Sequence, residues 1–198
     1  MTIKRDNISI TNQNIINMKK RVLSLLMVFG LMASTVAMAD NNQWTKMDEN
    51  SSIESNVKLV ESTDNHIRLE FDFNAYTLKS VKTPRGTSNL IEIPNCTRTK
   101  IKGAPDLPKI SQSVVIPDYA EMKIEVIKSR YIEIKDVDIA PSKGVMTRDK
   151  KTSEYPYVYG TEYSQDKFFP NNIASARDPF IIRNVRGQSI VVNPVQYN

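Results

Sequence analysis

Residues 67–74 read IRLEFDFN and form the clearest strand pattern of this 198-residue chain. Apolar and polar residues alternate throughout the stretch, so a strand would place its apolar side chains on one face and its polar ones on the other. Residues 57–60, VKLV, precede it, and the polar residues 62–65 separate the two runs. We therefore expect a β-hairpin with one buried face.

Further short apolar runs follow, most of them bounded by proline or glycine: residues 90–93, 111–116, 122–127, 131–134, 179–183 and 189–192. The 10 prolines recur along the chain. No stretch of about 12 residues shows helical periodicity free of them. The sequence thus predicts an all-β fold, an antiparallel β-sandwich.

The single cysteine and single histidine limit the chemistry that this chain can carry. They allow neither an internal disulfide nor a Cys-His metal cluster, so disulfide scaffolds and zinc fingers are excluded. Cys96 and His66 form the only nucleophile and base pair, and no small-residue turn surrounds Cys96. We expect a lone thiol and a turn histidine, with no catalytic residue, no metal site and no cofactor.

The front of the chain has the pattern of a secretory signal peptide. Residues 18–39 read MKKRVLSLLMVFGLMASTVAMA, with a basic head, an apolar run and a small-residue end at Ala37 and Ala39. The apolar run is too short to span a membrane, and cleavage would leave Asp40 as the first exported residue. Residues 1–17 are expected to be a spurious or disordered leader, because Met18 fits a start position.

The net charge of +5 comes mostly from this front segment. Residues 1–39 hold five basic residues and one acidic residue, so the rest of the chain has 22 basic and 21 acidic side chains. Proteins that bind nucleic acid need a clustered basic face, which so balanced a chain does not suggest. We expect no nucleic-acid partner, and no membrane contact after signal removal.

The exported part divides into a polar, flexible lead-in at residues 40–56 and a domain at residues 57–198. Residues 95–109 are expected to form an ordered, turn-rich crossing. Residues 141–154, PSKGVMTRDKKTSE, are expected to form an exposed, mobile loop. A protease could bind Arg148 in this loop as an extended segment, although composition alone favours an ordinary solvated loop.

Two other patterns have structural explanations. Asp136 and Asp138 lie two residues apart, but calcium needs more oxygen ligands than they supply, so we expect a solvated strand face. Tyr155, Tyr157 and Tyr159 could stack on a sugar or on single-stranded nucleic acid. Tyrosine ladders in sheets more often pack, and packing is the interpretation that we favour.

From residue 122 onward the sequence resembles the N-terminal propeptide of the gingipains, which are secreted cysteine endopeptidases, and especially of the arginine-specific type. The matching segments keep the family's order and spacing: MKIEVIKSRYIEIKDVDIAPSKGVMTR at 122–148, PYVYG at 156–160, DKFFP at 166–170, DPFIIR at 178–183, VRGQ at 185–188 and PVQYN at 194–198. KGAPDLPKISQS at 102–113 extends the resemblance upstream.

The resemblance implies a β-sandwich prodomain that assists the folding of its protease, covers the active-site cleft and is cut away on maturation. In that family an inhibitory loop follows the APSKG segment, and its arginine occupies the protease's arginine pocket. The matching position here is Arg148, flanked by Met146, Thr147 and Asp149. The implied partner is the catalytic domain of a gingipain-like cysteine protease, outside the inner membrane in the periplasm, at the outer-membrane surface or in the extracellular space.

The resemblance also sets limits on what carries over. The family's propeptide continues past the position of Asn198 into further strands, a catalytic domain and an export domain, so we expect a fragment or a truncated gene with an unpaired sheet edge. Cys96 and His66 match no catalytic position of the family. Two alternatives remain open: a secreted cell-surface β-sandwich adhesin, and the front end of a chain that is the whole cysteine protease.

Overall fold

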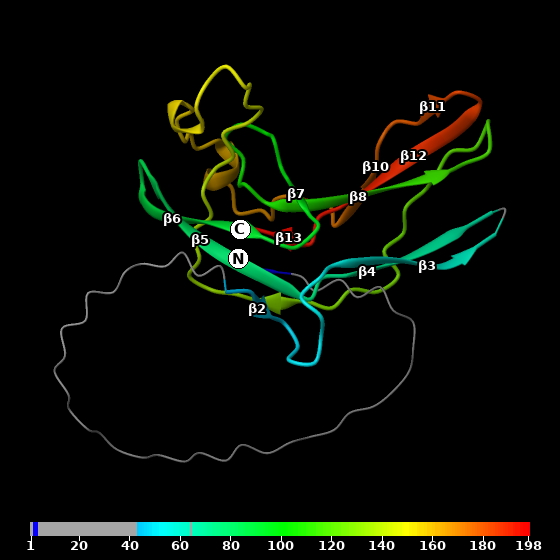
Figure 1. Ribbon diagram of the computed structural model, residues 1–198, viewed down its shortest axis with the longest axis horizontal. Helices are drawn as coiled ribbons and strands as arrows, with labels where there is room; N and C mark the ends of the chain where they lie inside the picture. Colours follow the sequence, from blue (N-terminus) through cyan, green and yellow to red (C-terminus); the bar gives the residue numbers. More distant parts are fainter. Residues whose placement is uncertain (1, 4–42, 64) are drawn as a thin grey trace, which may run out of the picture.

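The computed structural model of the protein describes residues 2–3, 43–63 and 65–198. In this part of the chain the strands form antiparallel sheets, so the predicted all-β antiparallel fold is confirmed (Figure 1). The strands are β1 (Thr2–Ile3), β2 (Thr45–Lys46), β3 (Asn56–Ser62), β4 (Ile67–Asp72), β5 (Ala75–Thr83), β6 (Gly86–Glu92), β7 (Thr97–Arg98), β8 (Pro108–Val115), β9 (Ile132–Glu133), β10 (Ala174–Ala176), β11 (Phe180–Ile182), β12 (Val185–Val192) and β13 (Val195–Gln196). Two short 3-10 turns are present, η1 (Thr152–Glu154) and η2 (Thr161–Ser164).

The largest sheet has the strand order β10-β12-β8-β7, and β11 also pairs with β12. Opposite it lie the sheet β2-β5-β6 and the hairpin β3-β4 (Figure 1). A small third sheet has the order β13-β1-β9. The two main layers therefore enclose the core between them, as a sandwich requires.

The expected hairpin around residues 67–74 is confirmed. In the β3-β4 pair, Leu59 lies opposite Leu69 and Val57 lies opposite Phe71. The register shifts between Leu59 and Glu61, where β3 has a bulge. The alternation seen in the sequence therefore points Phe71 and Phe73 to one side, toward the opposite layer.

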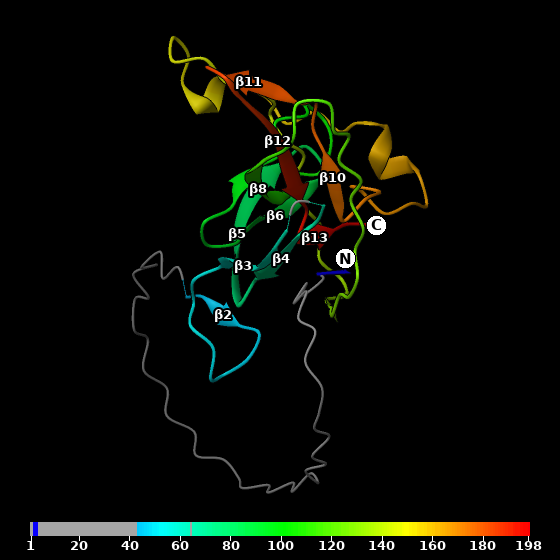
Figure 2. The same ribbon diagram turned by 90° about the vertical axis from the view of Figure 1, so that its right-hand side faces the viewer.

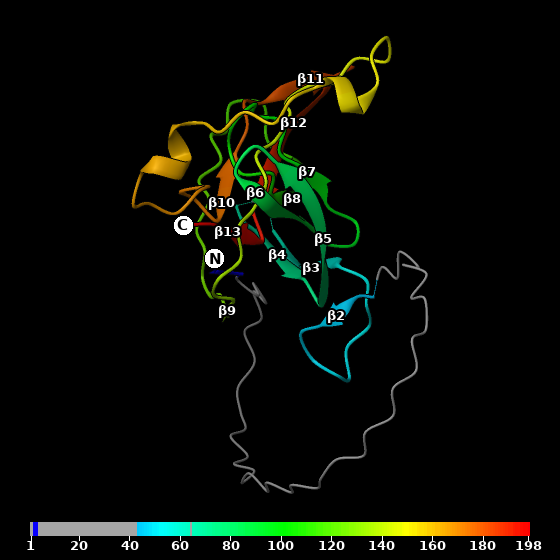
Figure 3. The same cartoon turned by 90° about the vertical axis from the view of Figure 1, so that its left-hand side faces the viewer.

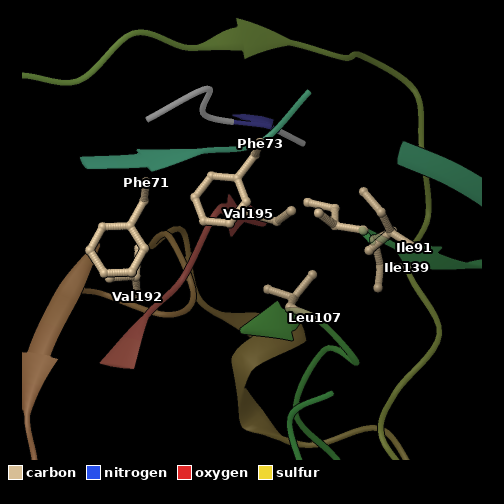
Figure 4. Packing of buried hydrophobic residues seen from close by; sticks show 8 residues of the cluster. Phe71, Phe73, Ile91, Leu107, Ile139, Val192 and Val195 are labelled. Atoms are coloured by element: carbon tan, nitrogen blue, oxygen red, sulfur yellow. The ribbon is translucent and has the colours of Figure 1, made fainter. Parts of the chain in front are cut away.

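Phe71 and Phe73 form the centre of the core. Phe73 is fully buried and Phe71 is 2% exposed. Figure 4 shows the two rings pointing from the β4 region toward Val192 and Val195, with Leu107 close by. Apolar side chains from both layers thus meet in one cluster.

Two strand predictions differ from the structure. Residues 122–127 have the predicted alternation, with Met122 and Ile124 half-buried between exposed neighbours, yet they pair with no strand, so the predicted strand is wrong. Conversely, β5 is the longest strand, and the sequence pattern does not predict it because AYTLKSVKT contains few large apolar residues. Strand formation needs a hydrogen-bonded neighbour, which a local pattern does not specify.

The proposed signal peptide at residues 18–39, with Ala37, Ala39 and the cleavage residue Asp40, lies outside the described residues. Within the predicted lead-in, β2 pairs with β5 and Met47 packs against the core. Upstream of the proposed signal, β1 pairs with both β9 and β13. In the part of the chain that is described, no helix is long and apolar enough to cross a membrane.

We predict that Phe73→Ala destabilises the fold by about 3–5 kcal/mol, because it removes a fully buried ring from the centre of the core. Leu59→Ala is the matched control: Leu59 is 58% exposed on the neighbouring strand, so its truncation should change stability by less than about 0.5 kcal/mol. Urea denaturation followed by circular dichroism measures both changes. Equal losses would contradict this assignment of the core.

Candidate functional site

Residues 143–160, here called the Arg148 loop, leave the body of the sandwich as one long excursion (Figure 1). Both of its ends bind the same short segment. The Gly103 amide donates to the carbonyl of Ser142 at 2.9 Å, and the Ser142 amide donates to Ala104 at 2.7 Å. The Gly160 amide donates to the Gly103 carbonyl at 2.8 Å. The loop therefore begins and ends at one fixed place on the fold.

This close approach of backbones requires glycine on both sides. A Cβ atom on Gly103 would lie 3.3 Å from the Gly160 Cα, and one on Gly160 would lie 3.0 Å from the Gly103 carbonyl oxygen. Gly103 also has a φ of +89°, in the region that favours glycine. The turn-rich crossing expected at residues 95–109 is thus the segment that holds the loop.

An ion-pair bridge fixes the crossing itself. The Arg98 guanidinium donates to Glu92 at 2.8 Å and to Asp106 at 2.9 Å. Burial raises the pKa of the Asp106 carboxyl, and the Arg98 charge opposes that rise without cancelling it. Ser142 adds a side-chain bond to the Thr99 carbonyl at 2.9 Å. Charged and neutral contacts together hold the base of the loop.

The C-terminal end of the loop also packs on the β5-β6 hairpin. The Arg85 guanidinium lies 4.0 Å from the centre of the Tyr159 ring, a cation-π contact. The Tyr159 hydroxyl shares hydrogen bonds with Thr83 at 2.8 Å and with Ser88 at 3.1 Å. Tyr163 meets the Tyr159 ring edge to face at 4.7 Å. This side of the base is therefore both stacked and hydrogen-bonded.

Asp138 belongs to the same network. Its carboxylate accepts a hydrogen bond from the Ser88 hydroxyl and a second one, at 3.3 Å, from the Tyr197 hydroxyl. The expectation of a solvated strand face is wrong for Asp138, because the chain bends at Asp136, whose φ is 57°. Within the described ranges, no three His, Cys, Asp or Glu side chains gather as metal ligands.

The tip of the loop is exposed. Met146, Thr147, Arg148 and Asp149 lie together there, and Arg148 and Asp149 form a turn. The Tyr155 hydroxyl bonds to Thr147 twice: it accepts the backbone amide at 3.0 Å and shares a bond with the side-chain oxygen at 2.7 Å. These bonds lower the pKa of the Tyr155 phenol. A fixed base thus presents a tip that is open to a partner.

Lys143 makes a second link across the loop. Its ammonium donates to the Thr152 carbonyl at 2.9 Å and lies 4.4 Å from the centre of the Tyr157 ring. Residues 155–160 form no strand, so the expected tyrosine ladder of a sheet is absent. Tyr157 and Tyr159 pack through their rings, as expected, but each on a different partner, whereas Tyr155 is bonded through its hydroxyl. The sequence could not identify these partners, because turns of the chain bring them close.

The structure does not bring Cys96 and His66 together. Cys96 packs against the core, and burial raises the pKa of its thiol to about 12. His66 lies in the exposed β3-β4 turn, where its Nδ1 bonds to Thr63 at 2.9 Å and its Nε2 lies 3.0 Å from Glu61. A thiol with so high a pKa is a poor nucleophile at neutral pH.

A separate cavity of about 480 Å³ lies between β4, the end of β8 and residues 120–126. Leu69, Phe71 and Met122 are among its lining residues. The cavity lies toward the β3-β4 end of the molecule, whereas the Arg148 loop projects from the opposite end (Figure 1). We therefore consider the loop and not the cavity as the candidate site.

A family model described as Propeptide_C25 matches residues 48–198. The chain belongs to this propeptide family. Over 144 residues it is 44% identical to Gingipain R1 of Porphyromonas gingivalis, a match that covers 72% of this chain and 14% of that protein. It is 40% identical to Gingipain R2 over 142 residues, which cover 72% of this chain and 19% of that protein. The chain thus spans less than a fifth of these two relatives.

The same fold occurs in the complex of Porphyromonas gingivalis RgpB pro- and mature domains. That match has a TM-score of 0.69 and 40% identity, and it covers 72% of this chain and 74% of the other. A structure on the zymogenic latency of gingipain K has a TM-score of 0.59 at 20% identity, which shows a shared fold. The resemblance to gingipain propeptides that the sequence predicted is therefore confirmed.

We predict that folded Cys96 reacts slowly with a thiol reagent at pH 8, because with a pKa of about 12 only about one thiol in 10⁴ is ionised. Denaturation in urea should restore the ordinary thiolate fraction and speed the reaction by more than about a hundredfold. Timed alkylation with iodoacetamide measures both rates. Fast alkylation of the native chain would contradict the burial of this thiol.

Proposed function

We propose that this chain acts as the propeptide that chaperones a gingipain-like cysteine endopeptidase and keeps it latent by placing Arg148 in the active-site cleft. One observation carries the proposal. Arg148 lies at the exposed tip of a loop whose two ends are bonded to the same segment, Gly103 and Ala104, in a fold shared with a gingipain prodomain. An inhibitory arm needs this combination of fixed base and open tip.

Arginine suits this role chemically. A pocket that selects arginine offers a carboxylate, and the planar guanidinium satisfies it with paired, charge-assisted hydrogen bonds. Lysine has a single compact ammonium and matches such a pocket less well. The neighbours Met146, Thr147 and Asp149 would lie in the cleft on either side of the arginine.

The rest of the domain would supply the wider contact. Covalent attachment of the loop to a second binding surface keeps its local concentration high, so that the tip rebinds after each release. The β11-β12 hairpin rises in the same direction as the loop in Figures 2 and 3, while Figure 1 shows the two separated along the long axis of the molecule. Its Ile181 is 72% exposed and its Ile182 is 64% exposed. Exposed apolar groups of this kind favour a protein interface.

We propose further that the chain is exported and performs no catalysis of its own. The pattern of residues 18–39 supports export, and the high pKa of the buried Cys96 thiol argues against a nucleophile here. A cell-surface adhesin is the alternative from a different class. An adhesin would leave the activity of an arginine-specific gingipain unchanged, so an inhibition assay separates the two functions.

We predict that the chain inhibits an arginine-specific gingipain and that Arg148→Ala weakens this inhibition at least about tenfold, because the pocket carboxylate loses its charged partner. The inhibition constant of Arg148→Lys should lie between those of the wild type and of Arg148→Ala. The measurement is an inhibition constant from titration of each variant into the protease with an arginyl substrate.

Lys150→Ala is the matched control, since Lys150 is an exposed cation of the same loop. It should keep the inhibition constant within about twofold of the wild type, in line with the small contribution of exposed charges. An Arg148→Ala variant that inhibits as well as the wild type would overturn the proposal. A wild-type chain without any effect on the protease would favour the adhesin.

A further inference from the structure

We propose that Tyr155 is a latch that joins the two sides of the Arg148–Asp149 peptide bond, so that a protease cuts this loop slowly and the cut loop stays in place. This inference rests on the proposed function and adds a positioning residue to it. The sequence does not distinguish Tyr155 from Tyr157 and Tyr159. Its importance follows from where its hydroxyl lies.

The latch spans the bond that a protease would attack. Thr147 immediately precedes Arg148, whereas Tyr155 follows it in the descending part of the loop. The Tyr155 hydroxyl accepts the Thr147 amide at 3.0 Å and shares a second bond with the Thr147 side-chain oxygen at 2.7 Å. Two bonds to one residue fix both the backbone and the side chain next to the arginine.

A second link lies nearer the base and spans the same peptide bond. Lys143, before Arg148, donates to the carbonyl of Thr152, after it, at 2.9 Å. The short turn η1 stabilises the Thr152 side, since the Lys151 amide donates to the Glu154 carboxylate at 3.1 Å. Hydrogen bonds therefore join the two sides of the loop at three places: at Gly103 in the base, between Lys143 and Thr152, and between Thr147 and Tyr155 near the tip.

Preorganisation of this kind favours tight binding. A loop that is already held in its bound shape loses less conformational entropy when it enters the cleft. Removal of the Tyr155 hydroxyl would leave the ring and the backbone of the loop unchanged and release only Thr147. A chain without this hydroxyl is therefore expected to bind the protease less tightly while keeping its fold.

The links from Tyr155 and Lys143 should also slow hydrolysis of the peptide bond after Arg148. In a cysteine endopeptidase the thiolate of the protease first attacks the Arg148 carbonyl, forms a thioester and releases the Asp149 amine; water then hydrolyses the thioester to the Arg148 carboxylate and frees the thiol. In a loop without links the released amine would diffuse away. Here the Tyr155 and Lys143 links still join the two sides, so the Asp149 amine stays next to the thioester and can attack it, which re-forms the peptide bond and releases the protease thiol before water does. Slow net cleavage and persistent inhibition follow.

The test compares Tyr155→Phe with the wild type against an arginine-specific gingipain. The loss of bonds to one hydroxyl should raise the inhibition constant about threefold to tenfold. Mass spectrometry should show faster accumulation of the chain cut after Arg148. Tyr119→Phe is the matched control, because Tyr119 is fully exposed outside the loop and its hydroxyl should not affect either measurement.

The outcomes separate the latch from the proposed function. If Arg148→Ala weakens inhibition while Tyr155→Phe changes neither the inhibition constant nor the cleavage rate, the latch is wrong and the inhibitory role stands. If Arg148→Ala has no effect, the inhibitory role itself fails. Unfolding midpoints of Tyr155→Phe and the wild type should agree, and a lowered midpoint would instead assign Tyr155 a role in stability.

Hydrogen exchange tests the latch in the free chain, without a protease. The Thr147 amide should exchange more slowly than the amide of Lys150, an exposed residue of the same loop, because only the Thr147 amide donates to Tyr155. Tyr155→Phe should abolish that difference. Equal exchange at the two amides in the wild type would overturn the proposal, whatever the inhibition assay shows.

Discussion

The backbone bonds of Gly103 to both ends of the Arg148 loop are the constraint on which the rest of the site depends. They require a residue without a side chain at Gly103 and again at Gly160, because a Cβ on either would press against the other backbone. They also require the crossing to be rigid, which the Arg98 bridge provides. A long loop can then extend from the sandwich without losing its position relative to the core.

The two parts of the loop differ in what stabilises them. At the base, the half-buried network of Tyr159, Ser88 and Asp138 joins segments that are distant in the sequence. Buried polar groups that are paired in this way specify one arrangement, since an unpaired partner would be costly. At the tip the side chains of Met146 and Arg148 are open to solvent. Order at the base and openness at the tip are both properties that a binding arm needs.

The sequence predicted those features that local patterns determine. The alternation in residues 67–74 predicted the β3-β4 hairpin and its buried rings, and the resemblance to gingipain propeptides pointed to Arg148. Local patterns failed where strands depend on distant partners, as at β5 and at residues 122–127. The sequence also did not predict the hydrogen bonds of Tyr155 and Lys143 across the loop, because a turn of the chain brings their partners close.

The most direct test of Arg148 as the inhibitory residue is a structure of this chain bound to the catalytic domain of an arginine-specific gingipain. The Arg148 guanidinium is expected to lie in the arginine pocket, with Thr147 still bonded to Tyr155 and the β11-β12 hairpin against the same partner. A complex in which the Arg148 loop lies outside the active-site cleft would contradict the central claim.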